Sequence, residues 1–363
     1  MSSRSDPDLL SSQPATPIFE FEEEPDQQPF PLDPNDPFSP SRGGTGTPNA
    51  AMCEDERQII RRYLQETTVY DVMPQSGKIV VIDSLLTVKS ALRAMSENNI
   101  VAAPLWSAED HDYSGVLTVT DWIDILRHFA SVPDGLNSSK PSITDLEALS
   151  LKEIRSTLAG SRPPRLIRSS PETPCLEVLR SLLTHKIHRM PIISPDDNTI
   201  LSIITHRSII RQLMTHLFAT HDLDILTHPI KKVNIGTFSG LVSCTTESPL
   251  IEVLDTLSLK KLSALPVLNH DGVIIEVYSK ADVFALSRRR EPITALHEPL
   301  YKFIQELRTS PLHFPTCSRT DTVETVLKKL GTTKAHRAFC VDDRGRFQGI
   351  ISLQDILKYL IEG

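Results

Sequence analysis

The stretch that decides the fold is Val116-Leu117-Thr118-Val119-Thr120-Asp121, because the chain contains this pattern four times. The other copies are Ile203-Ile204-Thr205-His206-Arg207-Ser208, Val277-Tyr278-Ser279-Lys280-Ala281-Asp282 and Ile350-Ile351-Ser352-Leu353-Gln354-Asp355. Each copy reads as a strand end, a Ser or Thr, two further residues and an acid, except that the second ends on Ser208. An anchor lies 16 or 17 residues before the end of each copy: Pro104, Pro191, Pro266 and Phe339. Two anchors at near-constant separation indicate four homologous units.

Each unit repeats one layout of strand, helix, strand, strand and helix. In unit one, apolar residues at helical spacing predict a helix over 87–98, between a strand over 78–82 and two strands over 102–106 and 115–118. A second helix over 119–129 follows. Turn-forming residues between the two inner strands are expected at 112–114, 196–198, 269–272 and 342–345.

The predicted fold class is α/β, with a small three-stranded sheet and two helices on one face in each unit. A unit of this size buries too little surface to be stable alone, so we expect two pairs in one pseudo-symmetric disc. The predicted boundaries are 68–130, 163–218, 236–288 and 312–362, with linkers over about 131–163 and 288–312 and a short helix over 54–66.

The composition bounds the class of protein. The chain has 363 residues and a formal charge of −8, of which residues 1–50 supply −7 through nine acids and two arginines. The remaining charge is close to neutral, which does not favour a nucleic-acid partner. No apolar run approaches the ~20 residues of a membrane span, and no signal-peptide core is visible. Five scattered cysteines without CxxC spacing indicate reduced thiols rather than disulfides or a zinc site.

Residues 1–52 are rich in Pro, Ser, Asp and Glu, which predicts a disordered acidic tail. The stretch Phe19-Glu20-Phe21-Glu22-Glu23-Glu24-Pro25 is either a docking segment for a partner or part of a solvated tail, and the second interpretation is favoured.

The final acid of the repeated pattern has two possible roles. A carboxylate at a helix start can accept both hydroxyls of a ribose, while the Ser or Thr three residues earlier can donate to phosphate near the helix N-terminus. The same spacing also describes a capping box, which needs no ligand. Recurrence at Asp121, Asp282 and Asp355 favours ribose binding.

Basic residues precede the inner strands at matched positions, and cations there suit phosphate oxygens. They are His188 and Arg189 in unit two, Lys261 in unit three, and His336 and Arg337 in unit four, with Arg207 beside the missing acid. A His-Arg pair that occurs in only one unit is more often part of an ordinary solvated surface than a phosphate site.

The layout resembles the CBS domain, the cystathionine β-synthase repeat. Four such units without a catalytic domain resemble the γ subunit of the AMP-activated protein kinase family. The matching motifs include NNIVAAPLW, HKIHRMPI, IITHR, IGTF at 235–238, LSALPV, VYSKADV, AHRAFCVDDRGR and ISLQDILKYL, over about residues 60–362.

The resemblance implies three adenosine sites and a regulatory role with AMP, ADP and ATP as ligands. By match to the family, the first site combines Thr118, Thr120 and Asp121 with Ile167, His188 and Arg189. The second combines Ser279 and Asp282 with His336 and Arg337. The third combines Ser352, Gln354 and Asp355 with Thr237, Val242, Ser263 and Ala264. Ile167 and Val242 would flank adenine or simply pack in the core.

Ser208 cannot form a charged bidentate contact, and the family also lacks an acid at this position, so unit two is expected to be silent. Three other positions depart from the family pattern and affect the expectation. Animal γ subunits carry a phosphate-binding Arg at the position of Val101, whereas fungal-type γ subunits resemble this chain in having an apolar residue there. Gln354 replaces a frequent Ser, and Arg207 replaces a Lys.

The resemblance also implies a heterotrimer with a kinase catalytic (α) subunit and a scaffold (β) subunit, in the cytoplasm and nucleus, with glucose and carbon metabolism as the signalling context. The alternative is a stand-alone CBS-pair regulator of a phosphatase, or a stress adaptor. An enzyme is disfavoured, because no P-loop, dinucleotide motif, nucleophile elbow or metal-ligand cluster is left over. We therefore expect no catalytic residue, no metal, no nucleic acid and no membrane.

Overall fold

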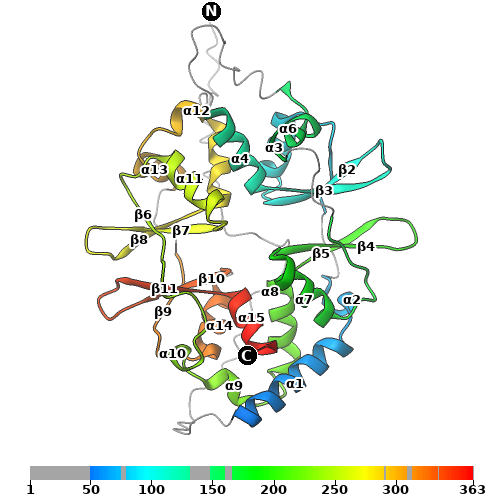
Figure 1. The fold of residues 1–363 in the computed structure, drawn as a ribbon, viewed down its shortest axis with the longest axis vertical. Coiled ribbons are helices and arrows are strands. Elements are labelled where there is room, and N and C mark those ends of the chain that lie inside the picture. The colour runs from blue at the N-terminus through cyan, green and yellow to red at the C-terminus, as the bar shows by residue number, and fades with distance from the viewer. Residues whose placement is uncertain are drawn as a thin grey trace, which may run out of the picture.

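The computed structural model describes residues 50–74, 79–130, 148–159, 166–289, 292–308, 313–333 and 335–362. The acidic tail expected before residue 50 lies outside this range. The chain forms a disc in which the four units lie around a common centre (Figure 1). The first helix, α1 (Ala50–Glu66), begins four residues earlier than expected and reaches into the segment predicted to be disordered.

Unit one has the predicted order of elements. Strand β2 (Ala102–Ser107) lies in the centre, parallel to β1 (Ile82–Asp83) and antiparallel to β3 (Asp112–Thr118). Helix α3 (Val88–Glu97) and helix α4 (Val119–Ala130) pack on this sheet's core. The side-chain oxygen of Thr87 accepts a hydrogen bond from Ser90 N, which explains where α3 begins.

The remaining units follow the same plan. Unit two contains α7 (Cys175–His185), β4 (Arg189–Ile193), β5 (Ile200–Thr205), α8 (His206–Gln212) and a π-helix (Leu213–Leu217). Unit three contains β6 (Cys244–Thr245), α11 (Leu250–Leu259), β7 (Ala264–Leu268), β8 (Ile274–Ser279) and a 3₁₀ helix (Lys280–Arg288). Unit four contains β9 (Thr316–Cys317), α14 (Val323–Thr332), β10 (Arg337–Val341), β11 (Phe347–Ser352) and α15 (Leu353–Ile361).

Three local predictions were wrong. The sheet of unit two has two strands, because its first strand is reduced to a bridge between Ser169 and Ile192. The first strand of unit one covers only Ile82–Asp83 within the described residues. The turn in unit one lies at 108–111, and 112–114 belong to β3; a register shift after Leu105 lengthens this hairpin.

The proline anchors lie in central strands, which is unusual because proline cannot donate to a ladder. In units one and three, the parallel neighbouring strand pairs only with residues that follow the proline. Strand β1 pairs with β2 from Leu105, after Pro104, and β6 pairs with β7 from Val267, after Pro266. In unit four the anchor is Phe339, whose N–H does donate, to Pro315 O at 2.9 Å.

The two predicted linkers, 131–163 and 288–312, contain helices: α6 (Leu151–Ala159), and α12 (Pro292–Ala295) with α13 (Leu300–Leu307). Further short helices are α2 (Val69–Val72), at the start of the predicted first unit, and α9 (Asp224–Thr227) and α10 (Ile230–Val233), between the predicted second and third units. The segment before unit one docks on unit two through the bridge Thr68–Pro174, and the segment before unit two docks on unit one through Thr87–Ser150. Units three and four exchange segments in the same way, through Pro229–Thr322 and Pro249–Pro299.

The apolar cores join the units in pairs that differ from the pairs that exchange segments. One core packs helices of units two and four together with α1, and contains Leu64, Leu179 and Ile356. The second packs units one and three, and contains Ile123, Leu254 and Phe284. Each unit therefore exchanges a segment with one neighbour and shares an apolar core with another, which closes the ring seen in Figure 1.

Candidate functional site

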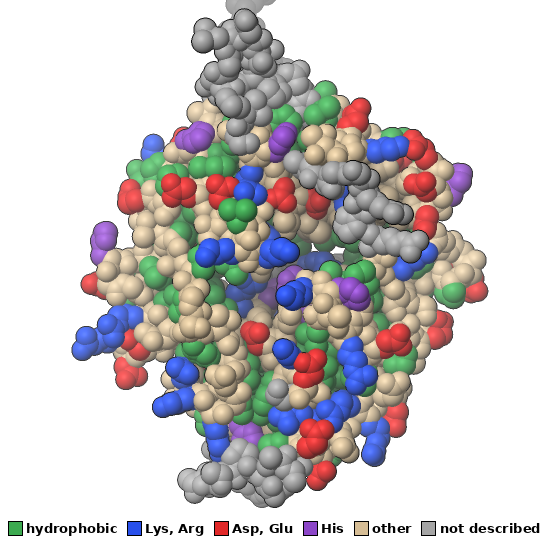
Figure 2. Space-filling view, viewed as in Figure 1, with side chains coloured by type: hydrophobic (Ala, Val, Ile, Leu, Met, Phe, Trp, Pro, Cys, Tyr) green, Lys and Arg blue, Asp and Glu red, His purple; other side chains and the backbone are tan. Residues whose placement is uncertain are grey.

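A cavity of about 520 Å³ lies where the four units meet. Figure 2 shows this central hollow with Lys, Arg and His side chains at its margin. Six Lys or Arg side chains and three histidines line it, against one carboxylate among the lining residues, that of Asp282. The cationic and imidazole side chains are Arg155, Arg189, Lys261, Lys280, Arg308, Arg337, His188, His206 and His336. Such a lining suits a ligand with several negative charges.

The acid of the repeated pattern caps its helix in all three units that carry it. Asp121 Oδ2 accepts from Thr118 N and from Thr118 Oγ1, both at 2.7 Å. Asp355 Oδ2 accepts from Ser352 N at 2.9 Å and from Ser352 Oγ at 2.7 Å. The capping interpretation is thus correct, but capping uses only one carboxylate oxygen. The second oxygen is the one a ligand hydroxyl would reach.

Unit two builds the same cap without a carboxylate. Thr205 N donates to Ser208 Oγ at 2.9 Å, and Ser208 Oγ donates to Thr205 O at 2.8 Å. Ser208 is only 2% exposed. Its hydroxyl is used within the cap, so unit two offers a ligand no acidic acceptor at this position.

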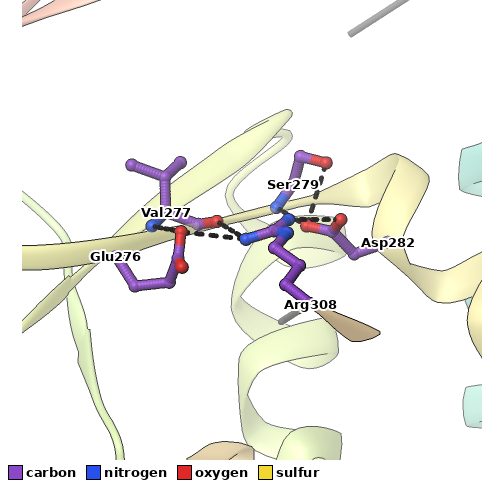
Figure 3. A network of polar contacts seen from close by, with 5 residues as sticks. All are labelled: Glu276, Val277, Ser279, Asp282 and Arg308. Atoms are coloured by element: carbon purple, nitrogen blue, oxygen red, sulfur yellow. Dashed lines mark hydrogen bonds and ion pairs between the residues drawn. The ribbon is translucent and has the colours of Figure 1, made fainter. Parts of the chain in front are cut away.

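Asp282 in unit three is bonded to Arg308 (Figure 3), a kind of partner that Asp121 and Asp355 do not have among the described residues. Its Oδ2 accepts from Ser279 N at 2.6 Å, and its Oδ1 accepts from Arg308 Nη2 at 2.6 Å. Arg308 Nη1 also donates to Glu276 Oε1 at 2.8 Å. The side chains of Arg308, Glu276 and Asp282 are 11%, 8% and 3% exposed, so this network is almost fully withdrawn from water.

Three histidines face one another across units two and four. The rings of His188 and His206 meet edge to face with centroids 5.7 Å apart. His206 is 5% exposed, and its Nε2 has no hydrogen-bond partner within the described structure. Burial, together with the nearby His188 and His336, lowers the pKa of His206 to about 3. His206 is therefore neutral at physiological pH.

Two contacts join units through residues of the cavity wall. Lys280 Nζ donates to Thr120 Oγ1 at 2.9 Å, which links unit three to unit one. Burial is the main cause that lowers the pKa of Lys280, and the nearby Asp124 opposes it. Arg337 of unit four donates to the hydroxyl of Ser263 in unit three.

The residues predicted for the site divide into two groups. The structure brings the larger group to the cavity wall: Thr118, Thr120, Ile167, His188, Arg189, Ser263, Ala264, Ser279, Asp282, His336, Arg337, Ser352 and Gln354. The others stand back from the wall: Asp121, Arg207, Thr237, Val242 and Asp355.

Those that stand back have identifiable surroundings. Arg207 donates to Ala335 O at 2.9 Å, a backbone contact that sequence reasoning did not anticipate. Thr237 exchanges backbone hydrogen bonds of 2.9 and 3.0 Å with Ile350, which places the 235–238 segment along β11. Val242 packs against the core of units one and three.

Among the basic and imidazole side chains of the wall, sequence reasoning missed four: Arg155, His206, Lys280 and Arg308. His206 and Lys280 lie inside the repeated pattern, one residue after its Ser or Thr, so their positions were available. Arg155 and Arg308 lie at exchanged segments, and no repeat pointed to them. Among the described residues, no three His, Cys, Asp or Glu side chains gather as metal ligands. None of the helices in those residues is long and apolar enough to span a bilayer.

Comparison with known proteins identifies the class. The family model of the CBS domain matches residues 69–128, 164–215, 224–289 and 304–362. The chain is therefore a protein of four CBS domains. A crystal structure of a Methanocaldococcus jannaschii protein, named as an archaeal homologue of the AMPK γ subunit, has the same fold. Its TM-score is 0.63 at 20% identity, covering 81% of this chain and 99% of that one.

Curated relatives then give the family. The γ subunit of the 5'-AMP-activated protein kinase of Saccharomyces cerevisiae is 30% identical over 84% of this chain and 94% of its own length. The Dictyostelium discoideum γ subunit is 37% identical over 85% of this chain, which spans 54% of that relative's length. The human γ-3 subunit is 29% identical over 99% of this chain and 72% of its own. The chain belongs to the family of AMP-activated protein kinase γ subunits.

Membership in this family agrees with the predicted regulatory rather than catalytic role. It does not favour the alternative of a stand-alone CBS-pair regulator.

Proposed function

We propose that the chain is the adenine-nucleotide-sensing regulatory subunit of an AMP-activated Ser/Thr protein kinase. The observation that carries the proposal is the central cavity, whose wall combines six Lys or Arg side chains with the capped helix starts of three units. Adenylates match this arrangement, because they join an acidic phosphate group to a ribose with two hydroxyl donors.

In this proposal the outer oxygens of Asp121, Asp282 and Asp355 accept ribose hydroxyls, and the basic side chains of the wall hold phosphate. Asp282 lies on the wall, whereas Asp121 and Asp355 stand back from it and are bonded to Thr118 and Ser352, which do line it. Unit two remains without a ribose site, because Ser208 is buried in its own cap. AMP, ADP and ATP compete for the sites, since they share adenosine and differ in phosphate charge.

The proposed partners are a kinase catalytic subunit and a scaffold subunit, and the proposed setting is the cytoplasm and nucleus. A nucleotide controls the kinase only if the assembled complex favours one liganded form, because a ligand shifts an equilibrium by its differential affinity. Copurification of the full chain with both subunits, and the change of kinase activity with AMP, test this part.

Binding itself is tested by isothermal titration of the full chain with AMP, ADP and ATP at fixed salt. The informative variants are Asp121→Ser, Asp282→Ser and Asp355→Ser, because unit two shows that serine at this position preserves the cap. Asp121→Ser and Asp355→Ser are each expected to weaken one site by roughly 10- to 100-fold, the equivalent of one hydrogen bond to a charged group. Asp282→Ser is expected to weaken its site less, because Arg308 already donates to Asp282 Oδ1.

The expected stoichiometry is three nucleotides per chain, with one lost in Asp121→Ser and one in Asp355→Ser. Thermal unfolding serves as the control for the cap. Absence of adenylate binding in the folded wild-type chain would overturn the proposal and leave helix capping as the sole role of the pattern.

A further inference from the structure

Arg308 distinguishes unit three from the other two units that carry an acid. It follows α13, the helix that leaves unit three and leads to unit four. Its guanidinium donates to Asp282 Oδ1 at 2.6 Å, to Glu276 Oε1 at 2.8 Å and to Val277 O at 3.2 Å. The guanidinium therefore spans three acceptors of unit three with bonds that water scarcely reaches (Figure 3).

The hydrogen-bond capacity of Asp282 is nearly exhausted. A carboxylate has about four acceptor positions, two on each oxygen. Oδ2 already accepts from Ser279 N at 2.6 Å and from Ser279 Oγ at 3.1 Å, and Arg308 takes one position on Oδ1. One position remains, whereas a bidentate contact to the two ribose hydroxyls needs two.

The corresponding acids of units one and four are differently placed. In Asp121 and in Asp355, both acceptor positions of Oδ2 are filled by the capping residue, as they are in Asp282. Within the described residues, neither Asp121 nor Asp355 has a hydrogen bond or ion pair on Oδ1. Both acceptor positions of Oδ1 in Asp121 and in Asp355 therefore remain for two ribose hydroxyls, so that binding there displaces no protein donor.

Unit one contains an arginine that makes the comparison sharper. Arg155 Nη1 donates to Val116 O at 3.2 Å, and Val116 occupies the same place in its repeat as Val277. Arg155 comes from α6, the exchanged segment that corresponds to α13. Arg155 thus meets the equivalent backbone carbonyl, but the described structure shows no hydrogen bond from it to Asp121, whereas Arg308 does bond the acid of its unit.

We propose that Arg308 controls the adenosine site of unit three by competing with ribose for Asp282. A bidentate ribose contact forms only when the guanidinium leaves Oδ1. Glu276 and the Val277 carbonyl remain as partners of the displaced arginine, so release does not leave its charge unpaired. The site of unit three is consequently the one that recognises ribose least, and this inference rests on the proposed function.

The readout is the ratio of dissociation constants for 2′-deoxy-AMP and AMP, which reports the carboxylate–ribose contact. Unit three is isolated in the full chain by Asp121→Ser with Asp355→Ser. Unit one is isolated by Asp355→Ser with Ala281→Trp, whose ring fills the cavity wall of unit three, because loss of Asp282 alone would not silence that unit. We expect a ratio below about 3 for unit three and about 10 or more for unit one, the value of one charged hydrogen bond. This comparison requires no change at Arg308.

Arg308→Gln and Arg308→Lys are then introduced where unit three is isolated, with Arg155→Gln where unit one is isolated. The ratio for unit three should rise to about 10 or more with glutamine, and less with lysine, which keeps the charge. The substitution at Arg155 should produce no rise. A purely structural role of Arg308 would weaken AMP and 2′-deoxy-AMP equally and leave the ratio unchanged.

Equal ratios for units one and three in the presence of Arg308 would overturn the inference, as would a ratio that does not respond to Arg308→Gln in a folded chain. If the wild-type chain binds AMP with discrimination at units one and four, the proposed function survives either result. If it binds no AMP at all, the proposed function and this inference fall together.

Discussion

Lys280 of unit three donates a hydrogen bond from Nζ to the hydroxyl of Thr120 in unit one, over 2.9 Å. The two residues belong to different repeats, and both line the central cavity. Burial lowers the pKa of Lys280, and Asp124 and Asp121 favour its charged form. An incoming phosphate would stabilise that charge further, because an anion close to an ammonium favours protonation.

Lys280→Met is therefore expected to weaken ATP binding about tenfold while leaving adenosine affinity nearly unchanged. Lys260→Met, at the exposed end of α11, removes a lysine outside the cavity wall and is the control. Titrations with ATP and with adenosine measure the difference. Equal losses for the two ligands would show that Lys280 supports the unit interface rather than phosphate.

His206 gives a prediction for stability against pH. Its pKa is about 3 in the folded chain and 6.5 in the ordinary state, so between these values the unfolded state binds more protons. The contribution of His206 to stability is complete above pH ~6.5 and is lost progressively as the pH falls toward ~3. The loss reaches about 2 kcal/mol at pH 5. His206→Gln should flatten the decline in the free energy of unfolding between pH 7 and 5.

Urea unfolding at several pH values measures this slope. His270→Gln, in an exposed turn of unit three, is the matched control and should retain the wild-type slope. An unchanged slope in His206→Gln would show that His206 does not cause the acid sensitivity.

The repeated pattern predicted much of the fold for a physical reason. A strand that ends on a capping Ser or Thr must be followed by a helix, and four copies fix four such junctions. The inner strands and following helices therefore lie where expected, as β3 and α4 do in unit one. The three acids predicted as special are each placed at a helix start.

The sequence could not predict which units pack together. Exchange of segments depends on contacts between distant residues, such as Thr68 with Pro174, and no periodicity records them. The same reason hid Arg308, which lies outside every repeat and reaches Asp282 only through the docking of α13. The turn of unit one was misplaced because its hairpin extends past the register shift at Leu105.

Gly236 supports the segment that lies along β11. Its φ is +98°, and a Cβ there would lie 2.6 Å from the carbonyl oxygen of Ile350. Gly236→Ala is therefore expected to destabilise the chain by about 1–3 kcal/mol through strain and displaced backbone. Gly240→Ala, also at positive φ but with nothing within 4 Å of its Cβ, should cost only about 1 kcal/mol. Chemical unfolding of both variants provides the comparison, and equal losses would exclude the clash with Ile350 as the cause.

Val101 lines the cavity. By the family resemblance, it stands at the position where animal γ subunits carry an arginine. Its carbonyl accepts from Val119 N at 3.0 Å, so the backbone there is held by the start of α4. Val101→Arg is expected to add one charged donor and raise ATP affinity about tenfold. Affinity should also fall more steeply with salt, because an added ionic contact is screened. Val101→Met adds bulk without charge and should do neither. If both variants change ATP affinity alike, the volume of the side chain at this position determines ATP affinity, and its charge does not.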